Sequence, residues 1–218
     1  MTYIFILFIF MVIYLYTKRY ENFQVNNPKN IIMTTYFCNK KDPQRPKKAP
    51  CNDFKYIEPW YNSVKKLGLN GVIFHDGMSK KFIAKYQTTK IKFICVKTHA
   101  KLSLNDYRYF IYFDYINNHP EIENIFMTDG NDVTVVNNPF KFINNKNIYV
   151  GSEIKGNKKY ILDKLDYINS NQNNYKLKLD TIYNAGILGG NRKKVLSFIK
   201  KMINIFNLVD KKNIDKNI

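Results

Sequence analysis

The sequence predicts an α/β domain with a mostly parallel central sheet flanked by helices, preceded by one N-terminal transmembrane helix. Three observations support this prediction. Short apolar, β-branched runs recur along the chain, segments with helical periodicity separate them, and the first residues form one uninterrupted apolar stretch. The 218 residues suffice for one domain with a sizeable core, but not for two domains plus a membrane segment.

The apolar N-terminal stretch runs from Tyr3 to Tyr16 and is followed by Lys18 and Arg19. As a helix it would extend roughly 21 to 25 Å, which suits a membrane thinner than the typical hydrocarbon core of about 30 Å. A cleavable signal peptide is disfavoured because the stretch lacks a basic leader and a small-residue cleavage site. We expect an uncleaved anchor at residues 1–19. The positive-inside rule would keep the side of Lys18 and Arg19 cytosolic, which conflicts with a lumenal catalytic domain.

After a polar linker at residues 20–29, the folded domain is expected at 30–210, with a polar tail at 211–218. Proline in the first turn of a helix and glycine after its end are typical boundaries. The first half of the domain is expected to contain strands at Ile31–Phe37, Gly71–Asp76 and Ile91–Val96 and helices at Pro59–Leu67 and Asn105–Asn118.

The second half is expected to continue the sheet. Its strands are predicted at Ile122–Met127, Val133–Val136, Asn147–Glu153 and Thr181–Leu188. Gly189 and Gly190 are expected to form a turn. The last helix is expected to bury an apolar stripe of Val195, Phe198, Ile199, Met202 and Phe206.

The chain is strongly basic, with 35 Lys and Arg against 17 Asp and Glu and a formal net charge of +18. Such a charge invites nucleic-acid binding, because neutralising phosphates supplies affinity without sequence information. The lysines are scattered singly or in pairs, however, and no helix-turn-helix, zinc-finger or base-stacking motif accompanies them. We therefore disfavour nucleic-acid binding; an anionic membrane surface or a nucleotide diphosphate fits the charge equally well.

The three cysteines, Cys38, Cys51 and Cys95, exclude a disulfide framework and a zinc site with paired spacing. In an oxidising compartment Cys38 and Cys51 could close the polar loop between them, but three free thiols are the favoured prediction. Cys95 lies within an apolar strand pattern and is expected in the core.

Two carboxylates follow the most apolar expected strand. Asp129 and Asp132 leave its end in a turn that Gly130 loosens, and ligands of open α/β sheets bind beyond the carboxyl ends of strands. Closely spaced carboxylates in a loop suit Mn²⁺ or Mg²⁺, which would bridge them to a diphosphate. The alternative is a turn in which both side chains cap backbone amides, and spacing alone gives the two interpretations about equal weight.

Four further residues are candidates for binding the donor. Arg108, one helix and one turn before Asp129, could pair with phosphates, although taken alone it is better explained as a surface cation. Asn184 and Gly186 end a strand in small residues that allow a ligand close to the backbone, or form a tight connection. Asp76, at the end of its strand, is an unspecific ribose contact; the neighbouring His75 is expected in the core.

Two segments carry a resemblance to a known family. They are "SLNDYRYFIYFDYINNHPEIENIFMTDGNDVTVVNNPF" at Ser103–Phe140 and "YNAGILGGNRKKVLSFIKKM" at Tyr183–Met202. With these segments, the chain from about Ile31 to Phe206 resembles the nucleotide-diphospho-sugar transferases of the Rossmann-like glycosyltransferase A (GT-A) fold.

This resemblance implies that Asp129 and Asp132 flank a Mn²⁺ or Mg²⁺ site and that Arg108 faces the donor phosphates. It places Asn184 and Gly186 on the sugar or acceptor side, and Asp76 and residues 34–36 nearer the nucleoside. The family most often has Asp-x-Asp where this chain has Asp-x-x-Asp, so Asp129 alone, or Asp129 with Asn131, is the alternative ligand set.

The function expected from the resemblance is transfer of a sugar from a nucleotide-diphosphate donor to an acceptor hydroxyl of a glycan, protein or lipid, by an enzyme held at a membrane. The first alternative is a catalytically degenerate GT-A protein that binds a nucleotide-sugar or a protein partner, which the short segment after Gly190 motivates. The second alternative is a basic module for membrane surfaces or nucleic acids, which rests on charge alone.

Overall fold

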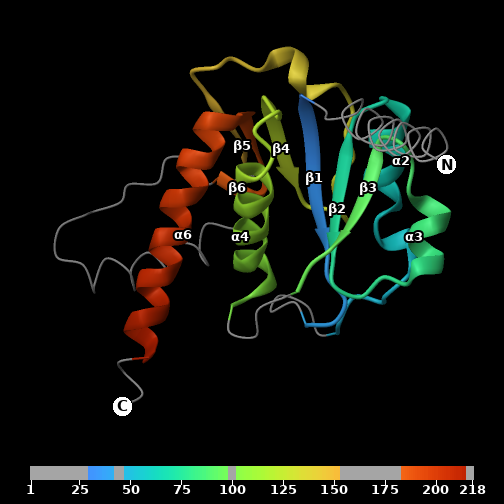
Figure 1. The fold of residues 1–218 in the computed structure, drawn as a ribbon, viewed down its shortest axis with the longest axis horizontal. Coiled ribbons are helices and arrows are strands. Elements are labelled where there is room, and N and C mark those ends of the chain that lie inside the picture. Colours follow the sequence, from blue (N-terminus) through green and yellow to red (C-terminus); the bar gives the residue numbers. More distant parts are fainter. Residues whose placement is uncertain (1–28, 42–46, 98–101, 153–182, 215–218) are drawn as a thin grey trace, which may run out of the picture.

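The computed structural model describes residues 29–41, 47–97, 102–152 and 183–214, which form a six-stranded sheet with helices on both faces (Figure 1). The strands are β1 (Asn30–Tyr36), β2 (Gly71–His75), β3 (Ile91–Cys95), β4 (Asn124–Thr128), β5 (Ile148–Ser152) and β6 (Tyr183–Asn191). The strands from β3 to β4 are parallel, whereas β6 runs antiparallel to β4 and β5. The predicted α/β class with a mostly parallel sheet is confirmed.

The spatial order of the strands is β3-β2-β1-β4-β6-β5. The chain adds β2 and β3 on one side of β1 and then returns to place β4 on the other side. The direction of strand addition therefore reverses between β1 and β4. In open α/β sheets such a reversal leaves a crevice beyond the carboxyl ends of the two strands, where ligands bind.

Four helices cover the two faces of the sheet in the described part of the chain. They are α2 (Glu58–Lys66) and α3 (Lys80–Tyr86) on one face, and α4 (Leu104–Asn117) and α6 (Arg192–Ile214) on the other (Figure 1). Two short 3-10 helices, η1 (Phe54–Tyr56) and η2 (Pro139–Phe142), lie in the connections. The sequence did not predict α3, because seven residues are too few for helical periodicity to be recognised; Ser79 caps it by accepting a hydrogen bond from the Phe82 amide at 3.2 Å.

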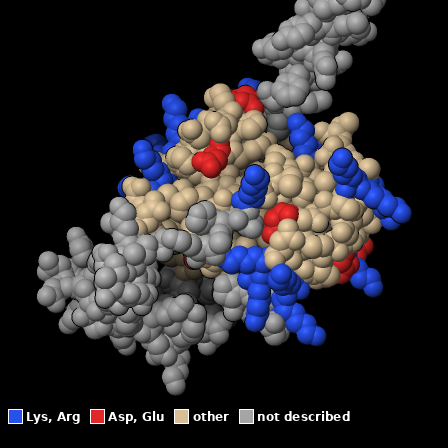
Figure 2. Space-filling model, turned by 60° about the horizontal axis from the view of Figure 1, so that its bottom comes forward, with Lys and Arg blue, Asp and Glu red and all other residues tan. Residues whose placement is uncertain are grey.

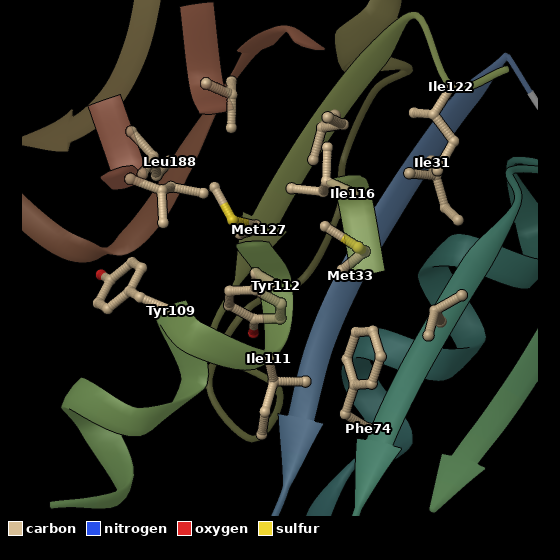
Figure 3. Packing of buried hydrophobic residues seen from close by; sticks show 14 of the residues in the cluster. Ile31, Met33, Phe74, Tyr109, Ile111, Tyr112, Ile116, Ile122, Met127 and Leu188 are labelled. Carbon is tan, nitrogen blue, oxygen red and sulfur yellow. The ribbon is translucent and has the colours of Figure 1, made fainter. Parts of the chain in front are cut away.

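Side chains from alternate positions of β1 enter two different cores. Ile31 and Met33 pack with α4 and α6, where Tyr112 and Ile116 are fully buried (Figure 3). Ile32 and its neighbours on the same face pack instead with α2 and α3. A strand covered on both faces has no polar alternation, which is why the sequence shows continuous apolar runs here.

The final helix buries only part of its predicted stripe. Val195 and Ile199 are fully buried, and Met202 and Phe206 pack against the same core from its margin. Phe198 was expected to be buried but is 37% exposed. The buried face of α6 is therefore narrower than the sequence pattern predicted.

The predicted strand at residues 133–136 is absent. The Val135 amide donates a hydrogen bond to the Ser63 hydroxyl on α2 at 3.0 Å, so it is not available to a strand partner. Val133 and Val135 pack against the core beneath them, and Val136 is 81% exposed. The alternation of apolar residues reflects a loop lying on the core.

The predicted turn at Gly189 and Gly190 is also wrong, because β6 continues through both residues. Gly189 pairs with Phe126 of β4, and a Cβ atom on Gly189 would lie 2.3 Å from the Phe126 ring. Gly190 has a φ of +143°, which residues with a side chain rarely adopt. Close packing and backbone conformation within the strand require these glycines.

The cysteine predictions need two corrections. Cys38 and Cys51 form a disulfide, whereas three free thiols were favoured. Cys95 is a free cysteine, as expected, but it is exposed. It lies at the end of the edge strand β3, where the apolar pattern does not imply coverage on both faces.

The predicted membrane anchor lies outside the described residues. Among the helices of the described part, none combines the length and the apolar character needed to cross a membrane.

Candidate functional site

A cavity of about 490 Å³ opens at the carboxyl ends of β1 and β4, where the direction of strand addition reverses. It is built from the ends of β1 and β4, the start of α4, the first half of β6 and one face of α6. The described residues that line it are Thr35, Phe37, Lys40, Ala49, Tyr56, Leu104, Asn105, Asp106, Arg108, Tyr109, Asp129, Gly130, Asn131, Asp132, Asn184, Ala185, Gly186, Met202 and Phe206.

Five of the six residues predicted for the site meet in this cavity, although they come from segments far apart in the sequence. They are Arg108, Asp129, Asp132, Asn184 and Gly186. The sixth, Asp76, is not among the lining residues.

Arg108 is a buried cation on α4, only 8% exposed, and not the surface side chain that its position alone suggested. Its Nη1 forms an ion pair with Asp129 Oδ1, and its Nη2 donates to the Ala185 carbonyl at 3.1 Å. Burial lowers the pKa of the guanidinium, but the neighbouring tyrosines and Asp129 outweigh that effect, so the pKa of Arg108 lies above its usual range. Arg108 is therefore a permanent positive charge in the cavity wall.

The third nitrogen of the Arg108 guanidinium differs from the other two. The Nε of Arg108 is buried and has no hydrogen-bond partner among the described residues. The Tyr109 ring lies beside the guanidinium, with 5.2 Å from Arg108 Cζ to the ring centroid, and its hydroxyl donates to the same Ala185 carbonyl at 3.1 Å. The guanidinium is thus held rigidly by α4 and β6.

Asp129 is fixed by the antiparallel pairing of β4 with β6. Its amide donates to the Gly186 carbonyl at 2.8 Å, which extends the ladder one residue beyond Thr128. A Cβ atom on Gly186 would lie 2.5 Å from Asp129 Oδ2 and 2.6 Å from Asn184 Oδ1. Gly186 is therefore needed for its lack of a side chain, because the Asp129 carboxylate occupies that space.

The loop from Asp129 to Asp132 lies close over the end of β1. A Cβ atom on Gly130 would be 2.7 Å from Thr34 Oγ1, so only glycine allows this approach. Asp132 is exposed at the cavity and is the carboxylate most open to solvent in this loop. The strand end is held from the other face by Trp60, whose Nε1 donates to Thr128 Oγ1 at 2.8 Å.

The start of α4 faces the cavity with a closed hydrogen-bond cap. The Asp106 amide donates to Ser103 Oγ at 3.1 Å, and the hydroxyl donates back to Asp106 Oδ2 at 2.6 Å. Leu104 and Asn105 line the cavity in this first turn. The partial positive charge of the helix N-terminus lies here beside the Asp106 carboxylate, which lines the cavity and partly offsets it.

The donor set suits Mn²⁺ or Mg²⁺ in one specific way. In the described part of the chain, no three His, Cys, Asp or Glu side chains are grouped to hold a metal ion. The site instead offers Asp132 and Oδ2 of Asp129, since Oδ1 of Asp129 is paired with Arg108. Magnesium is commonly held by one or two carboxylates together with substrate phosphates and water, so these residues fit an ion that arrives with a diphosphate.

Asp76 lies outside the cavity lining and binds backbone amides of the protein. Its Oδ1 accepts a hydrogen bond from the Cys38 amide at 2.8 Å, and both of its carboxylate oxygens accept from the Asn39 amide at 3.3 Å. Asp76 therefore ties the end of β2 to the chain leaving β1.

Sequence reasoning missed one wall of the cavity. Phe37, Lys40, Ala49 and Tyr56 line the side beyond β1, and Lys40 Nζ donates to the Leu102 carbonyl. The only signal was the position of Lys40 shortly after the first strand, because the loop that brings Ala49 and Tyr56 back has no periodic pattern. Of the strand residues 34–36, expected near the nucleoside, Thr35 lines the cavity.

No protein-family model matches the chain, and no curated protein matches it. Among solved structures, the galactosyltransferase LgtC in complex with donor and acceptor sugar analogs is similar at 14% identity and a TM-score of 0.48, over 81% of this chain and 65% of that chain. The glycosyltransferase GlyE of Streptococcus pneumoniae TIGR4 is similar at 14% identity and a TM-score of 0.49, over 86% of this chain and 40% of that chain. An active-site mutant of LgtC is similar at 16% identity and a TM-score of 0.44, over 75% of this chain and 58% of that chain. The chain thus spans less than two thirds of the length of each structure.

Proposed function

We propose that the chain is a glycosyltransferase that moves a sugar from a nucleotide-diphosphate donor to an acceptor hydroxyl, with Mn²⁺ or Mg²⁺ at Asp129 and Asp132. The observation that carries this proposal is the convergence of a buried cation, three carboxylates and a glycine-lined strand in one cavity at the strand reversal of the sheet. Such a combination suits a ligand that bears both a diphosphate and a polyhydroxylated group.

The positive groups of the cavity account for binding of the diphosphate. Arg108 is held in place before any ligand arrives, and the N-terminus of α4 lies beside it. Lysine and arginine side chains are spread over this end of the molecule, with few acidic ones among them (Figure 2). A preorganised cation gains affinity for phosphate because little side-chain entropy is lost on binding.

The two sides of the cavity differ, and this difference suggests the orientation of the donor. Phe37 and Tyr56 on the β1 side offer aromatic surface to a nucleoside base. Asn184 and Gly186 on the β6 side offer an amide and open backbone to the sugar hydroxyls. The diphosphate would then lie between them, beside Arg108 and Asp129.

Sugar transfer makes one bond and breaks another. The acceptor oxygen bonds to the anomeric carbon and loses its proton, and the bond from that carbon to the diphosphate oxygen breaks, so nucleoside diphosphate leaves with an added negative charge. The divalent cation, when bound, would neutralise part of that charge. Arg108 stabilises the same charge from the protein side, in a wall where burial strengthens its field.

We also propose that residues 1–19 anchor the enzyme to a membrane, which would restrict its acceptors to those at that surface. The apolar stretch Tyr3–Tyr16 motivates this proposal. Expression of the full chain and fractionation in carbonate buffer tests it: an anchored protein stays with the membranes, and release of the full chain into the supernatant contradicts the anchor.

The activity is tested with Asp132→Ala and with the matched control Asp114→Ala, which removes an exposed carboxylate from the outer side of α4. We expect Asp132→Ala to lower donor turnover roughly 100-fold or more without unfolding the domain, because it removes a ligand of the divalent cation that would neutralise the leaving diphosphate. Asp114→Ala should retain full turnover. Unchanged turnover in Asp132→Ala would contradict the site, and donor binding without turnover at any metal concentration would favour the degenerate binding protein.

A further inference from the structure

The Cys38–Cys51 disulfide lies directly behind one wall of the cavity. This wall, the β1-side wall, consists of Phe37, Lys40, Ala49 and Tyr56. Phe37 immediately precedes Cys38, and Ala49 lies two residues before Cys51. The bridge therefore joins the two chain segments that build the wall.

The two ends of the bridge differ in how firmly they are held. Cys38 is 4% exposed, its amide is bound by Asp76 at 2.8 Å, and its sulfur lies 2.9 Å from where a Cβ of Gly77 would be. Cys51 is exposed, and its neighbour Asn52 adopts a positive φ of 62°. The β1 end is thus part of the core, and the Cys51 end is surface loop.

A second tether links the same two segments. The Tyr36 hydroxyl hydrogen bonds to the carbonyls of Pro50 and Asp53, the latter at 3.0 Å, and the Tyr36 ring stacks on Tyr56 with 4.6 Å between centroids. Burial raises the pKa of Tyr36 to about 12, so this hydroxyl keeps its proton at neutral pH. The segment from Pro50 to Tyr56 is therefore tied to β1 by the disulfide and by the contacts of Tyr36, and to the start of α3 by the Ser79 amide, which donates to Asn52 Oδ1 at 2.7 Å.

We infer that the Cys38–Cys51 disulfide positions the β1-side wall for the donor, so that the redox state of this bridge sets the donor affinity. The inference rests on the proposed function, because it assigns a positioning role to Cys51 at the same site. With the bridge intact, the segment that carries Ala49 is tied to the end of β1, and Phe37, Ala49 and Tyr56 line one cavity before the donor binds. With the bridge open, the donor must order the Cys51 segment itself, which costs affinity.

Opening the bridge requires a dithiol. A thiolate of the dithiol attacks the sulfur of Cys51, the more exposed of the two residues, the sulfur–sulfur bond breaks, and Cys38 leaves as a thiolate that takes up a proton. The second thiol of the reductant then resolves the mixed disulfide. The products are two cysteine thiols and the cyclic disulfide of the reductant.

The test titrates the oxidised full chain with UDP, GDP, ADP and CDP before and after dithiothreitol, at a temperature where both forms are folded. We expect the dissociation constant of the nucleotide that binds to rise roughly tenfold on reduction. Cys51→Ser should have the dissociation constant of the reduced form, with or without dithiothreitol. Cys95→Ser, which keeps the bridge, should show the same rise on reduction as the unmodified chain. Tyr36→Phe should weaken binding more in the reduced form, where the hydroxyl contributes a larger share of the contacts that hold this segment against β1.

Hydrogen exchange supplies a readout that needs no nucleotide. The amides of Tyr56 and Ile57, bonded to the carbonyls of Asp53 and Phe54, should exchange faster after reduction. If no nucleotide binds the oxidised chain, the proposed function fails and exchange alone decides the positioning role of the bridge. An unchanged dissociation constant, or unchanged exchange of these two amides, would overturn the inference while leaving the proposed function in place.

Discussion

Arg108 shows how strongly the surroundings of one residue decide its role. On an isolated helix it would be a solvated cation, whereas here β6 supplies a carbonyl and β4 supplies Asp129, and the side chain is buried between them. The cost of burying the charge is offset only because both partners are in place. Neither partner can be identified from the residues around Arg108.

Arg108→Ala should weaken nucleoside diphosphate binding by roughly 10- to 100-fold, since a charge-assisted contact is lost. It should also lower the free energy of unfolding by about 2 kcal/mol, because Asp129 loses its partner. Calorimetric titration and denaturant unfolding measure the two effects.

The matched control is Arg192→Ala, at the start of α6, where the side chain contacts the end of α4 that lies away from the cavity. Arg192 donates to the Ile116 carbonyl at 3.0 Å and lies outside the cavity lining. This variant should lose stability but keep its affinity. Equal loss of affinity in both variants would mean that Arg108 acts only through the fold.

The burial of His75 predicts how the stability of the domain depends on pH. It is 2% exposed, and burial lowers its pKa from the ordinary value of 6.5. Below pH 6.5 the unfolded chain therefore takes up a proton that the folded chain does not, so the free energy of unfolding should fall as the pH is lowered from 6.5. Above pH 6.5 the contribution of His75 should be constant.

His75→Asn can keep the hydrogen bond that His75 Nδ1 accepts from the Met78 amide at 3.2 Å, and it removes the titrating group. Denaturant unfolding between pH 7 and pH 5 should show a shallower fall in stability for this variant. The unmodified chain, measured over the same pH range, provides the reference slope. If His75→Asn keeps that slope, His75 is not the group responsible.

At the scale of elements, β6 is where pattern and structure disagree most. The Gly189–Gly190 pair indicates a turn by composition, and the reason that it lies in a strand is the Phe126 ring on β4, 63 residues earlier in the chain. Non-local packing of this kind leaves no local signature. The opposite error occurred at residues 133–136, where a strand was predicted and the structure has a loop. Packing of Val133 and Val135 on the core gives this loop the alternation of apolar residues that is typical of a strand.

Gly189→Ala should lower the free energy of unfolding by about 2 kcal/mol, because the new methyl group overlaps the Phe126 ring. Adding Phe126→Leu should recover part of that loss, since a smaller side chain leaves room for the methyl group. Denaturant unfolding of the single and double variants forms the cycle. Additive losses in the double variant would contradict the steric explanation.

The elements that the sequence predicted well are those decided locally. Pro59 and Gly68 bracket α2 within one or two residues, and the continuous apolar runs of β1, β2 and β4 follow from burial on both faces. The site was partly predictable for a related reason: Asp129 follows a strand end, and strand ends of a parallel sheet meet at one edge. The β1-side wall could not be predicted, because its loop is held in place by a disulfide and a tyrosine hydroxyl and has no periodic pattern.

At the scale of the whole molecule, the strand order and the charge act together. The sheet reverses direction between β1 and β4, where the cavity opens, and the chain carries a formal net charge of +18, with Lys and Arg side chains outnumbering acidic ones on the face that Figure 2 shows. A positive field of this kind speeds the arrival of anionic ligands and leaves selectivity to the contacts within the cavity. The account therefore depends on one central claim, that the cavity binds a nucleotide diphosphate.

The most direct test is the thermal unfolding of the full chain with UDP, GDP, ADP, CDP and their sugar conjugates, each with and without Mn²⁺. Selective binding to the folded state at about 100 times the dissociation constant should stabilise it by about 2.7 kcal/mol. The account predicts a Mn²⁺-dependent stabilisation by the nucleotides of one base, absent in Arg108→Ala. A flat response across the whole panel would contradict it.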